Sequence, residues 1–241
     1  MKTAIVLLSA GLDSTVSLAL AREAGVSIRL GLCFDYGQRA AAAEWRQAQL
    51  LAAHYQLPLQ RIELPWLAEI STSALSSKST EALPQVPVEQ LDNITSVTLA
   101  SAAKVWVPNR NGALINIAAA FADAGGESLI LTGFNAEEAA TFPDNTPQFA
   151  EAISRSLAFS TQVQPQVKSF VQHLNKVEIL REAVRLEVPI AKLWSCYADG
   201  TSHCGRCESC SRLKRALTAG GQPHYLDQLF QPFQPFEAAD A

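Results

Sequence analysis

The sequence predicts an α/β fold with a doubly wound, mainly parallel sheet, followed by a small metal-binding segment. Two observations lead to this fold class. Short apolar runs rich in β-branched residues alternate with longer runs that carry apolar residues at helical spacing, which is the pattern of βαβ units. Four of the five cysteines stand between Cys196 and Cys210, and such clustering is typical of a metal site rather than of a disulfide framework.

The composition fits one large domain with a small appendage. Of 241 residues, 48% are hydrophobic and 17% are charged, so the chain can bury a sizeable core and is not disordered as a whole. Lys and Arg total 19 against 23 Asp and Glu, a formal net charge of −4, which argues against general nucleic-acid binding. Apolar runs such as Ile5–Leu8 and Ile117–Ala122 are far shorter than the roughly 20 residues of a membrane span. With no convincing signal-peptide cleavage site, we expect a cytoplasmic protein without membrane contact.

The first half of the chain shows repeated strand–helix alternation. Strands are predicted at Thr3–Leu8, Ile28–Phe34 and Leu59–Leu64, because each is a short apolar run. Helices are predicted at Ser14–Ala24, which stops at Gly25, and at Ala40–Tyr55. Right-handed crossovers between parallel strands would then bring ligands to the carboxyl ends of the strands.

The second half begins with a break in this pattern. From Ser71 to about Ser101 the chain is rich in Ser, Thr and Pro, which indicates either a functional lid or a poorly ordered segment. The later predicted elements are helices at Gly112–Ala124, Pro147–Phe159 and Lys176–Leu186, a buried strand at Leu129–Leu131 and an extended run at Val163–Phe170. The tail from Gly221, with its two Gln-Pro-Phe repeats, is expected to be irregular.

A polar turn, Ser9-Ala10-Gly11-Leu12-Asp13-Ser14-Thr15, joins the first strand to the first helix. A helix N-terminus presents unpaired N–H groups and a positive dipole end, which suits a phosphate. Gly11 permits a close backbone approach and a positive φ, and Ser9, Ser14 and Thr15 add hydroxyl donors. Asp13 is interpreted as a helix cap or as an acid that holds the loop. On spacing alone, simple capping by Asp13 and Ser14 remains an alternative to phosphate binding.

This turn resembles the Ser-Gly-Gly-x-Asp-Ser loop of the ATP-pyrophosphatase (PP-loop) family, whereas the Walker P-loop and the three-glycine dinucleotide fingerprint are absent from the sequence. Enzymes of that family bind ATP through the loop and release pyrophosphate. The resemblance therefore implies an ATP-binding stretch made of Leu8, Ser9, Ala10, Gly11, Leu12, Asp13, Ser14, Thr15, Val16, Ser17 and Leu18. Ala10 stands where the family usually has its first glycine, so we expect a tighter approach of the loop to the phosphates.

The cysteine cluster reads Cys196-x7-Cys204-x2-Cys207-x2-Cys210, with Gly205 allowing a tight knuckle. Four thiolates satisfy tetrahedral zinc, and two-residue spacings let neighbouring sulfurs face one ion. An iron–sulfur cluster is the main rival, but the ferredoxin-like spacing and trailing Pro are missing, and a redox dithiol would leave two cysteines unused. We therefore predict one structural Zn²⁺ per chain.

The zinc prediction defines the expected domain organisation. Residues 1–190 are predicted to form the ATP-binding α/β domain, residues 191–220 the zinc-binding segment, and residues 221–241 an irregular C-terminal tail. His203 could replace one zinc ligand but is interpreted as a solvated loop residue. Cys33, in an apolar run, is interpreted as a buried small hydrophobe.

Further motifs, in the right order, make the chain similar to the 7-cyano-7-deazaguanine synthase family of queuosine biosynthesis, a family of PP-loop enzymes. The resemblance extends from Lys2 to about Leu217. Besides the turn and the cysteine pattern, the matching segments are Phe34-Asp35-Tyr36-Gly37-Gln38-Arg39, Val107-Pro108-Asn109-Arg110-Asn111, Gly133-Phe134-Asn135-Ala136-Glu137, Pro143-Asp144 and Leu174-Asn175-Lys176-Val177-Glu178. Each polar segment follows a predicted strand or opens a helix, where an open parallel sheet collects its ligands.

This resemblance implies an ATP-dependent carbon–nitrogen ligase that converts 7-carboxy-7-deazaguanine and ammonia into 7-cyano-7-deazaguanine through an acyl-adenylate and an amide. It implies ATP as co-substrate, Mg²⁺ beside it, and a homodimer, which is typical of the family. The implied catalytic residues are Lys176, Arg110 and Asp13. Lys176 and Arg110 would neutralise charge as pyrophosphate leaves, although either could be a solvated basic side chain. Asn111 and Asn135 could equally cap helices.

Two departures from the family pattern concern the acceptor. The family usually reads Tyr-Pro-Asp-Cys-Arg where this chain has Phe142-Pro143-Asp144-Asn145-Thr146, and Ala40 stands where His is common. We expect the 142–146 region to face the deazapurine. A PP-loop enzyme that adenylates a different acceptor, such as a diverged deazapurine or a tRNA base, is therefore one alternative. Thiolation of a tRNA base usually needs a reactive cysteine near the ATP site, and Cys33 is the one cysteine outside the cluster.

A non-catalytic zinc-knuckle module is the more distant alternative. Its sequence support is a set of basic residues around the knuckle, namely Arg206, Arg212, Lys214 and Arg215, which would contact nucleic-acid phosphates or another protein. The overall acidity of the chain and the polar turn at Ser9–Ser14 do not favour it.

Overall fold

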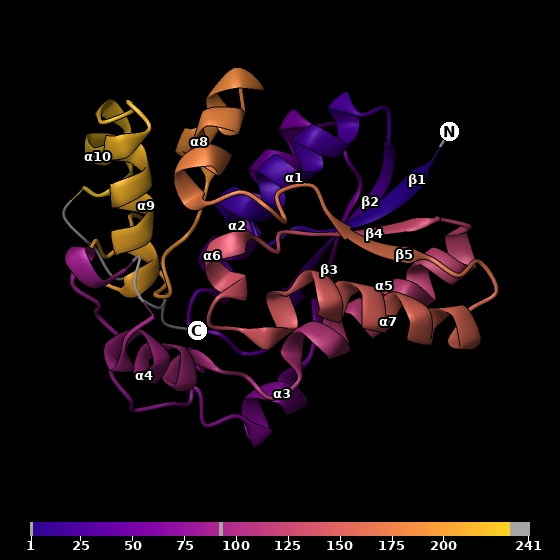
Figure 1. The fold of residues 1–241 in the computed structure, drawn as a ribbon, viewed down its shortest axis with the longest axis horizontal. Helices are drawn as coiled ribbons and strands as arrows, with labels where there is room; N and C mark the ends of the chain where they lie inside the picture. Colours follow the sequence, from indigo (N-terminus) through magenta and orange to yellow (C-terminus); the bar gives the residue numbers. More distant parts are fainter. Residues whose placement is uncertain (1, 92–93, 232–241) are drawn as a thin grey trace, which may run out of the picture.

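A five-stranded parallel sheet lies at the centre of the computed structural model, which describes residues 2–91 and 94–231 (Figure 1). Its strands are β1 Thr3–Leu7, β2 Ser27–Asp35, β3 Leu59–Glu63, β4 Leu129–Thr132 and β5 Gln166–Ser169. They lie in the order β3-β2-β1-β4-β5, and every neighbouring pair is parallel. The chain thus leaves β1 first toward β2 and β3 and later toward β4 and β5. The predicted doubly wound parallel sheet is confirmed.

Ten α-helices are described in residues 2–91 and 94–231. Their bounds are α1 Leu12–Glu23, α2 Ala41–His54, α3 Pro65–Ile70, α4 Ser96–Val105, α5 Arg110–Gly125, α6 Ala136–Ala139, α7 Pro147–Ser160, α8 Lys176–Arg185, α9 Glu208–Ala219 and α10 His224–Leu229. Short 3₁₀ helices occur at Val88–Gln90, Pro143–Asn145 and Ile190–Lys192. Among the described residues, no helix is long and apolar enough to cross a bilayer.

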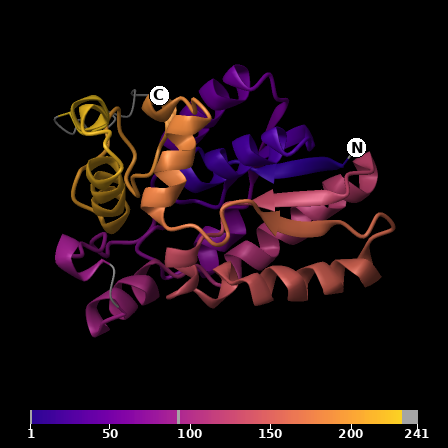
Figure 2. The same ribbon diagram turned by 45° about the horizontal axis from the view of Figure 1, so that its top comes forward.

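Helices cover both faces of the sheet, which is why β1 is apolar along its length. On one face, α5 and α7 pack over strand residues such as Ile5 and Ile130, and Leu157 of α7 is buried among them. On the other face, α1 lies against the sheet and against α8, and α8 in turn packs on α9 (Figures 1 and 2). Buried residues of α1, α8 and α9 belong to one continuous apolar cluster. The cysteine segment is therefore joined to the sheet domain through α8.

Two predicted irregular regions contain helices, so these predictions were wrong in part. The helix α4 begins at Ser96, inside the stretch from Ser71 to about Ser101 that was predicted to be a lid or a poorly ordered segment, and a capping box at Thr95 and Thr98 starts it. The helix α10 lies in the tail, where burial of Leu229 stabilises six residues too few to show a periodicity. Of the two Gln-Pro-Phe repeats, all but Gln231 lies outside the described residues.

Arg39 holds part of the Ser/Thr/Pro-rich stretch in place. Its guanidinium donates to the carbonyl oxygens of Ser76, Ser79 and Glu81, the last two at 2.8 and 2.7 Å. Leu75, in the same stretch, lines the large cavity described below. This part of the stretch therefore forms a wall of that cavity.

Candidate functional site

The turn between β1 and α1 has a different geometry from the one predicted. Gly11 is the residue before the helix and has φ −69°, whereas Ala10 has φ +61°. The left-handed conformation costs a residue with a Cβ about 1–2 kcal/mol. The backbone N–H of Trp194 donates to the Ala10 carbonyl at 2.9 Å, and Ala10 is fully buried. The expectation of a positive φ at Gly11 was wrong, because tertiary contacts place that conformation one residue earlier.

A second glycine brings β4 close to this turn. A Cβ on Gly133 would lie 2.6 Å from the backbone nitrogen of Ser14, a separation that real Cβ atoms do not adopt. Gly133 therefore lets the carboxyl end of β4 approach the N-terminus of α1. The segment Gly133–Glu137 and the turn thus form one site.

The predicted ATP-binding stretch divides into two parts in the structure. The residues that line the cavity are Leu8, Ser9, Gly11, Leu12, Asp13 and Ser14. Ala10, Thr15, Val16, Ser17 and Leu18 are fully buried. The Thr15 hydroxyl donates to the Gly11 carbonyl at 2.8 Å, whereas the Ser9 and Ser14 hydroxyls lie 3.2 Å apart at the cavity. Ser9 and Ser14 are thus the hydroxyls placed to meet a phosphate.

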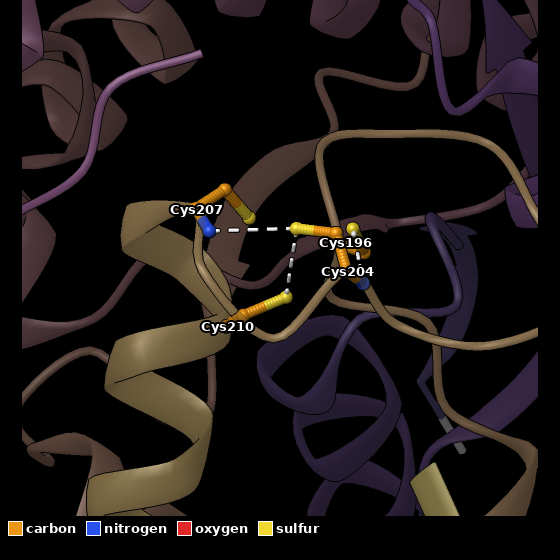
Figure 3. Close-up of side chains that lie close together, drawn as sticks. All are labelled: Cys196, Cys204, Cys207 and Cys210. Carbon is orange, nitrogen blue, oxygen red and sulfur yellow. Dashed lines mark hydrogen bonds between the residues drawn. The ribbon is translucent and has the colours of Figure 1, made fainter. Parts of the chain in front are cut away.

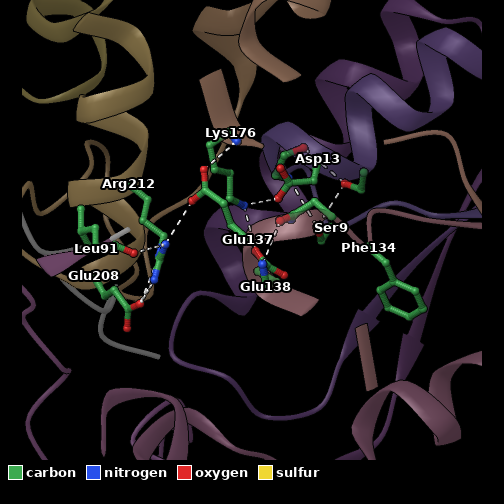
Figure 4. Close-up of polar contacts among 12 residues, drawn as sticks. Ser9, Asp13, Leu91, Phe134, Glu137, Glu138, Lys176, Glu208 and Arg212 are labelled. Atoms are coloured by element: carbon green, nitrogen blue, oxygen red, sulfur yellow. Dashed lines mark hydrogen bonds and ion pairs between the residues drawn. The ribbon is translucent and has the colours of Figure 1, made fainter. Parts of the chain in front are cut away.

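Lys176 lies between two carboxylates at the N-terminus of α1 (Figure 4). Its Nζ is 2.5 Å from Asp13 Oδ2 and 2.8 Å from Glu138 Oε1. Burial alone would lower the pKa of Lys176, but the two carboxylates outweigh it and raise that pKa. Burial raises the pKa of Asp13 to about 6 although Lys176 opposes the shift. The structure therefore brings together two of the predicted catalytic residues, Lys176 and Asp13.

Asp13 does not cap α1, so that interpretation was wrong. It lies in the first turn of the helix, and its side chain makes no capping bond. Its second oxygen, Oδ1, is buried and has no hydrogen-bond partner among the described residues. A buried acceptor without a partner costs about 1–3 kcal/mol, which favours a role in binding a ligand or a cation.

Helix α8 holds Lys176 in position. Asn175 caps the helix by accepting from the Val177 and Glu178 amides, and the Glu178 carboxylate accepts in return from the Asn175 amide. The backbone N–H of Lys176 donates to Glu137 at 2.8 Å. A cation in the first turn is opposed by the helix dipole. Lys176 is thus placed for the cavity rather than for the stability of α8.

Arg110, the third predicted catalytic residue, begins α5 and lines the same cavity. Its Nη1 donates to the Tyr36 hydroxyl at 3.2 Å, and its guanidinium lies 5.5 Å from the centre of the Tyr36 ring. Asn111 does not cap α5 but donates to the Asp144 carbonyl. Asn135 does cap α6, since its side chain accepts from the Glu138 amide at 3.0 Å.

The region that departs from the family pattern lies partly at the cavity. Phe142 and Asn145 line it. Thr146 instead caps α7, accepting from the Phe149 amide at 3.2 Å. Ala40 is buried and also lines the cavity. Of the two changes at 145 and 146, only Asn145 therefore alters the wall of the cavity.

All these groups surround one cavity of about 290 Å³ at the carboxyl ends of β1, β2 and β4. Several of its lining residues were not singled out from the sequence, namely Glu44, Trp194, Tyr197, Glu208 and Ser209. None of these residues belongs to a short sequence motif, so the sequence offered no reason to select them. Only the sequence position of Glu44, five residues after Arg39, hints at a place near the strand end.

The buried side chain of Gln38 and the half-buried side chain of Glu44 form a hydrogen-bonded pair at the β2 side of the cavity. The Gln38 amide accepts from the Tyr36 N–H at 2.9 Å and donates to the Phe34 carbonyl at 3.0 Å and to Glu44 Oε2 at 2.7 Å. Burial raises the pKa of Glu44 to about 7.

The four predicted metal ligands, Cys196, Cys204, Cys207 and Cys210, point toward one another (Figure 3). All four sulfurs lie within 4.8 Å of one another, and those of Cys204 and Cys210 are 3.8 Å apart. Tetrahedral zinc with Zn–S bonds near 2.3 Å separates its sulfurs by about 3.8 Å. The cluster therefore has the donor set and spacing that suit zinc.

Backbone N–H groups also face these sulfurs. The amides of Ala198 and Cys204 each lie 3.3 Å from Cys196 Sγ, and the Cys207 amide lies 3.4 Å from Cys204 Sγ. Such donors favour thiolates and orient metal ligands. Gly205, at φ +72°, makes the tight knuckle that the sequence predicted.

His203 is buried, so its interpretation as a solvated loop residue was wrong. Its ring lies 4.6 Å from that of Trp194 and 5.2 Å from that of Phe230. Its Nε2 accepts from the Ser195 amide at 3.0 Å, and its Nδ1 donates to the Leu229 carbonyl at 3.1 Å. Burial lowers the pKa of His203 to about 4. Both ring nitrogens are thus engaged, which leaves the four sulfurs as the metal ligands.

Two of the basic residues near the knuckle, Arg212 and Arg215, are held in ion pairs and are largely shielded from solvent. Arg212 lies 3.1 Å from Glu137 and 2.7 Å from Glu208, and Arg215 lies 2.7 Å from Glu137. The side chains of Arg212, Arg215 and Glu137 are 13–14% exposed. Arg212 and Arg215 therefore do not supply the nucleic-acid-binding patch that a zinc-knuckle module would need.

Comparisons with known proteins agree with these features. A family model described as "Queuosine biosynthesis protein QueC" matches residues 3–221. A 7-cyano-7-deazaguanine synthase of Pelotomaculum thermopropionicum is 51% identical over 217 residues, which cover 90% of this chain and 97% of the relative. A second, of Desulforamulus reducens, is 48% identical over 217 residues, with coverages of 90% and 94%.

One solved structure shows the same fold at low sequence identity. It is a 4-thiouridine synthetase–RNA complex with bound ATP, and it matches with a TM-score of 0.50 and 18% identity over 97% of this chain and 54% of that chain. The likeness concerns the fold alone.

Proposed function

Because the chain belongs to the QueC family, we propose that its cavity beside the Ser9–Ser14 turn is where ATP activates a deazapurine carboxylate. The activity is that of an ATP-dependent 7-cyano-7-deazaguanine synthase. The observation that carries the proposal is the contact of Lys176 with Asp13 and Glu138 at the free N-terminus of α1. This arrangement supports the proposal because a cation and two carboxylates that suit a metal ion stand together at a helix N-terminus, which favours a phosphate.

The acceptor is 7-carboxy-7-deazaguanine, and its carboxylate needs activation because it is a poor acyl donor. The carboxylate oxygen attacks the α-phosphate of ATP, forming an acyl-adenylate and releasing pyrophosphate. Ammonia then displaces AMP and leaves the amide after loss of a proton. A second ATP adenylates the amide oxygen with release of pyrophosphate, and loss of AMP and protons gives the nitrile.

The residues of this chain act mainly by binding charge. The backbone N–H groups at the start of α1 and the hydroxyls of Ser9 and Ser14 bind phosphate oxygens. Lys176 leaves its carboxylate partners for the pyrophosphate as negative charge develops there, and Arg110 holds the carboxylate and α-phosphate together. Such preorganised donors are worth several kcal/mol of transition-state stabilisation.

The carboxylates fit a magnesium ion. Asp13 Oδ1 is buried without a hydrogen-bond partner in the described residues, and Glu138 lies on the other side of Lys176. Carboxylate oxygens suit Mg²⁺, so Asp13 and Glu138 would hold it. When bound, Mg²⁺ supplies charge neutralisation at the leaving pyrophosphate. The four cysteines would hold one structural Zn²⁺ per chain.

The first experiment tests the reaction. The purified protein is incubated with ATP, Mg²⁺, ¹⁵N-ammonium and 7-carboxy-7-deazaguanine, and the product is identified by mass spectrometry. We expect a ¹⁵N-labelled nitrile. ATP-dependent activation of a different carboxylate, with no nitrile from this one, would assign the protein to another acceptor.

The second experiment tests the turn. Asp13→Ala and Ser14→Ala are expected to abolish pyrophosphate release while the far-ultraviolet circular dichroism stays unchanged. Ser156→Ala, on the exposed side of α7, is the matched control and retains activity. If both turn variants released pyrophosphate at the wild-type rate, ATP would not bind at this turn and the proposal would be wrong.

A further inference from the structure

One carboxylate in the cavity makes no direct ion pair with a basic side chain among the described residues. The acidic residues that line the cavity are Asp13, Glu44, Glu137, Glu138 and Glu208. Lys176 contacts Asp13 and Glu138, and Arg212 contacts Glu137 and Glu208. In the part of the chain that the structure describes, Glu44 is hydrogen-bonded only by the Gln38 amide.

Glu44 is nevertheless fixed in place. Gln38 is 5% exposed, and its amide is held by the backbone at Phe34 and Tyr36, at the end of β2. It donates to Oε2 of Glu44 at 2.7 Å, which leaves Oε1 without a hydrogen bond to the described residues. A carboxylate in this position is an acceptor directed by the sheet itself and available to a ligand that carries N–H or O–H donors.

The acceptor carries matching donors. A guanine-like ring presents the N1–H and the 2-amino N–H side by side, followed by the O6 acceptor, and in this substrate the carboxylate on C7 lies next to O6. A carboxylate matches two adjacent N–H donors, and a guanidinium matches two adjacent oxygen acceptors. Arg110 lines the same cavity as Glu44 without a hydrogen bond between them.

Adenine fits this arrangement less well. Its N1 is an acceptor beside the N6 donor, so a carboxylate at that edge would meet one donor and one lone pair. A carboxylate such as that of Glu44 therefore meets two donors on the deazaguanine edge but only one on the adenine edge.

We propose that Glu44 accepts the N1–H and the 2-amino N–H of the acceptor and so selects a guanine-like ring. Gln38 is the positioning residue that fixes Glu44. This inference rests on the proposed function, since it assumes that the acceptor enters this cavity.

The test combines a protein change with a substrate change. Wild-type protein, Glu44→Gln and the control Glu63→Gln, whose side chain is 69% exposed, are compared on 7-carboxy-7-deazaguanine and on its analogue without the 2-amino group. We expect the wild type and the control to lose about 10- to 100-fold in kcat/KM on the analogue, the effect of one hydrogen bond to a charged group. For Glu44→Gln we expect a similar loss of kcat/KM on the natural acceptor. Its kcat/KM values on the two acceptors should differ by less than about threefold, and its KM for ATP should be unchanged.

Each other outcome overturns the inference or the function. Glu44→Gln with wild-type selectivity, or with a raised KM for ATP and unchanged selectivity, would assign Glu44 to the nucleotide or to the fold. Wild-type protein that forms no nitrile overturns the proposed function instead. Melting temperatures report on folding, and Glu44→Asp, which keeps the carboxylate, should retain the selectivity at a lower kcat/KM.

Discussion

At Ala10 the chain keeps a backbone conformation that a side chain makes costly. Its φ is +61°, and the family usually has glycine there. The conformation persists because the Ala10 carbonyl accepts from Trp194 and the methyl group is buried. A local cost at a ligand-binding turn, offset by tertiary contacts, is common at functional sites.

Asp13→Asn should raise stability at neutral pH. The pKa of Asp13 in the folded protein, about 6, lies above its usual 3.8, so the protonated form favours folding. That contribution is present below about pH 4 and is lost as pH rises through about 6. The stability gain of Asp13→Asn over wild type, measured by urea unfolding, should therefore grow between pH 4 and 7 to the order of 3 kcal/mol. A gain that does not change with pH would contradict this.

Lys176→Ala should lower turnover by about 100- to 1,000-fold, the cost of losing one preorganised electrostatic donor. The physical reason is that the pyrophosphate would leave without the cation now held by Asp13 and Glu138. Pyrophosphate release at saturating ATP measures it. Lys104→Ala, which removes an exposed lysine of α4, is the control. If Lys176→Ala kept the wild-type turnover, Lys176 would have no part in the reaction and the prediction would be wrong.

Among the elements, α6 depends on its neighbours. Four residues, Ala136–Ala139, are too few for a helix that is stable by itself. Glu137 joins α6 to the α8 backbone at Lys176 and to Arg212 and Arg215 of α9. Since Glu138 in α6 contacts Lys176, helix α9 also helps, through Glu137, to position Lys176.

Glu137→Gln should destabilise the protein by about 3–5 kcal/mol, because removing one partner of a buried ion pair leaves the other charges uncompensated. Chemical denaturation measures the loss. Glu151→Gln breaks an exposed pair with Arg155 in α7 and should cost at most about 1 kcal/mol. Equal effects of the two substitutions would show that the Glu137 network does not hold α6 to α9.

Zinc removal should loosen the segment from about Trp194 onward. Metal binding contributes on the order of 10 kcal/mol in isolated zinc peptides, and two of the ligands, Cys207 and Cys210, lie at the start of α9. Cys207→Ser or a chelator should raise hydrogen exchange in α9 and α10 and lower the melting temperature before it alters ATP chemistry directly. Cys33→Ser, outside the cluster, should keep both its zinc and its activity.

Elemental analysis of protein purified without added metal gives the decisive number. About one zinc per chain is expected. Iron with visible absorbance, or a folded active enzyme without metal, would refute the zinc assignment.

In the whole molecule, the sheet domain and the cysteine segment share one apolar cluster, which includes Leu12 of α1, Ile179 of α8 and Leu213 of α9. The predicted division into residues 1–190, 191–220 and 221–241 stays a prediction, as does the family's homodimer. The cavity lies between these parts, since its lining runs from Leu7 to Arg212. Ligand binding there should stabilise the molecule as a whole.

ATP with Mg²⁺ at 100 times its Kd should stabilise the protein by about 2.7 kcal/mol, which for a chain of this size raises the melting temperature by roughly 5–10 °C. Ser14→Ala should lose most of this shift at the same ATP concentration, whereas Ser156→Ala keeps it. Differential scanning fluorimetry measures both. An equal shift in the two variants would place ATP away from the turn.

Local sequence patterns were enough to predict the parallel α/β fold, the polar turn after β1 and the cluster of four cysteines. Strand and helix periodicities, and the spacing of ligands such as Cys207 and Cys210, lie within a few neighbouring residues, so local physics sets them. The family resemblance, rather than a local pattern, indicated Lys176, Arg110 and Asp13, which line one cavity. The helices α4 and α10 were not predicted, because their local patterns are too weak.

Contacts between side chains from distant parts of the sequence could be seen in the three-dimensional structure alone. The contact of Glu137 with Arg212 joins residues 75 positions apart, and that of Lys176 with Asp13 joins residues 163 apart. The burial of His203, the conformation of Ala10 and the exposure of Glu44 to the cavity likewise depend on neighbours from distant segments. Charge pairing and burial are set by the three-dimensional packing of the chain, and a linear pattern does not contain that information.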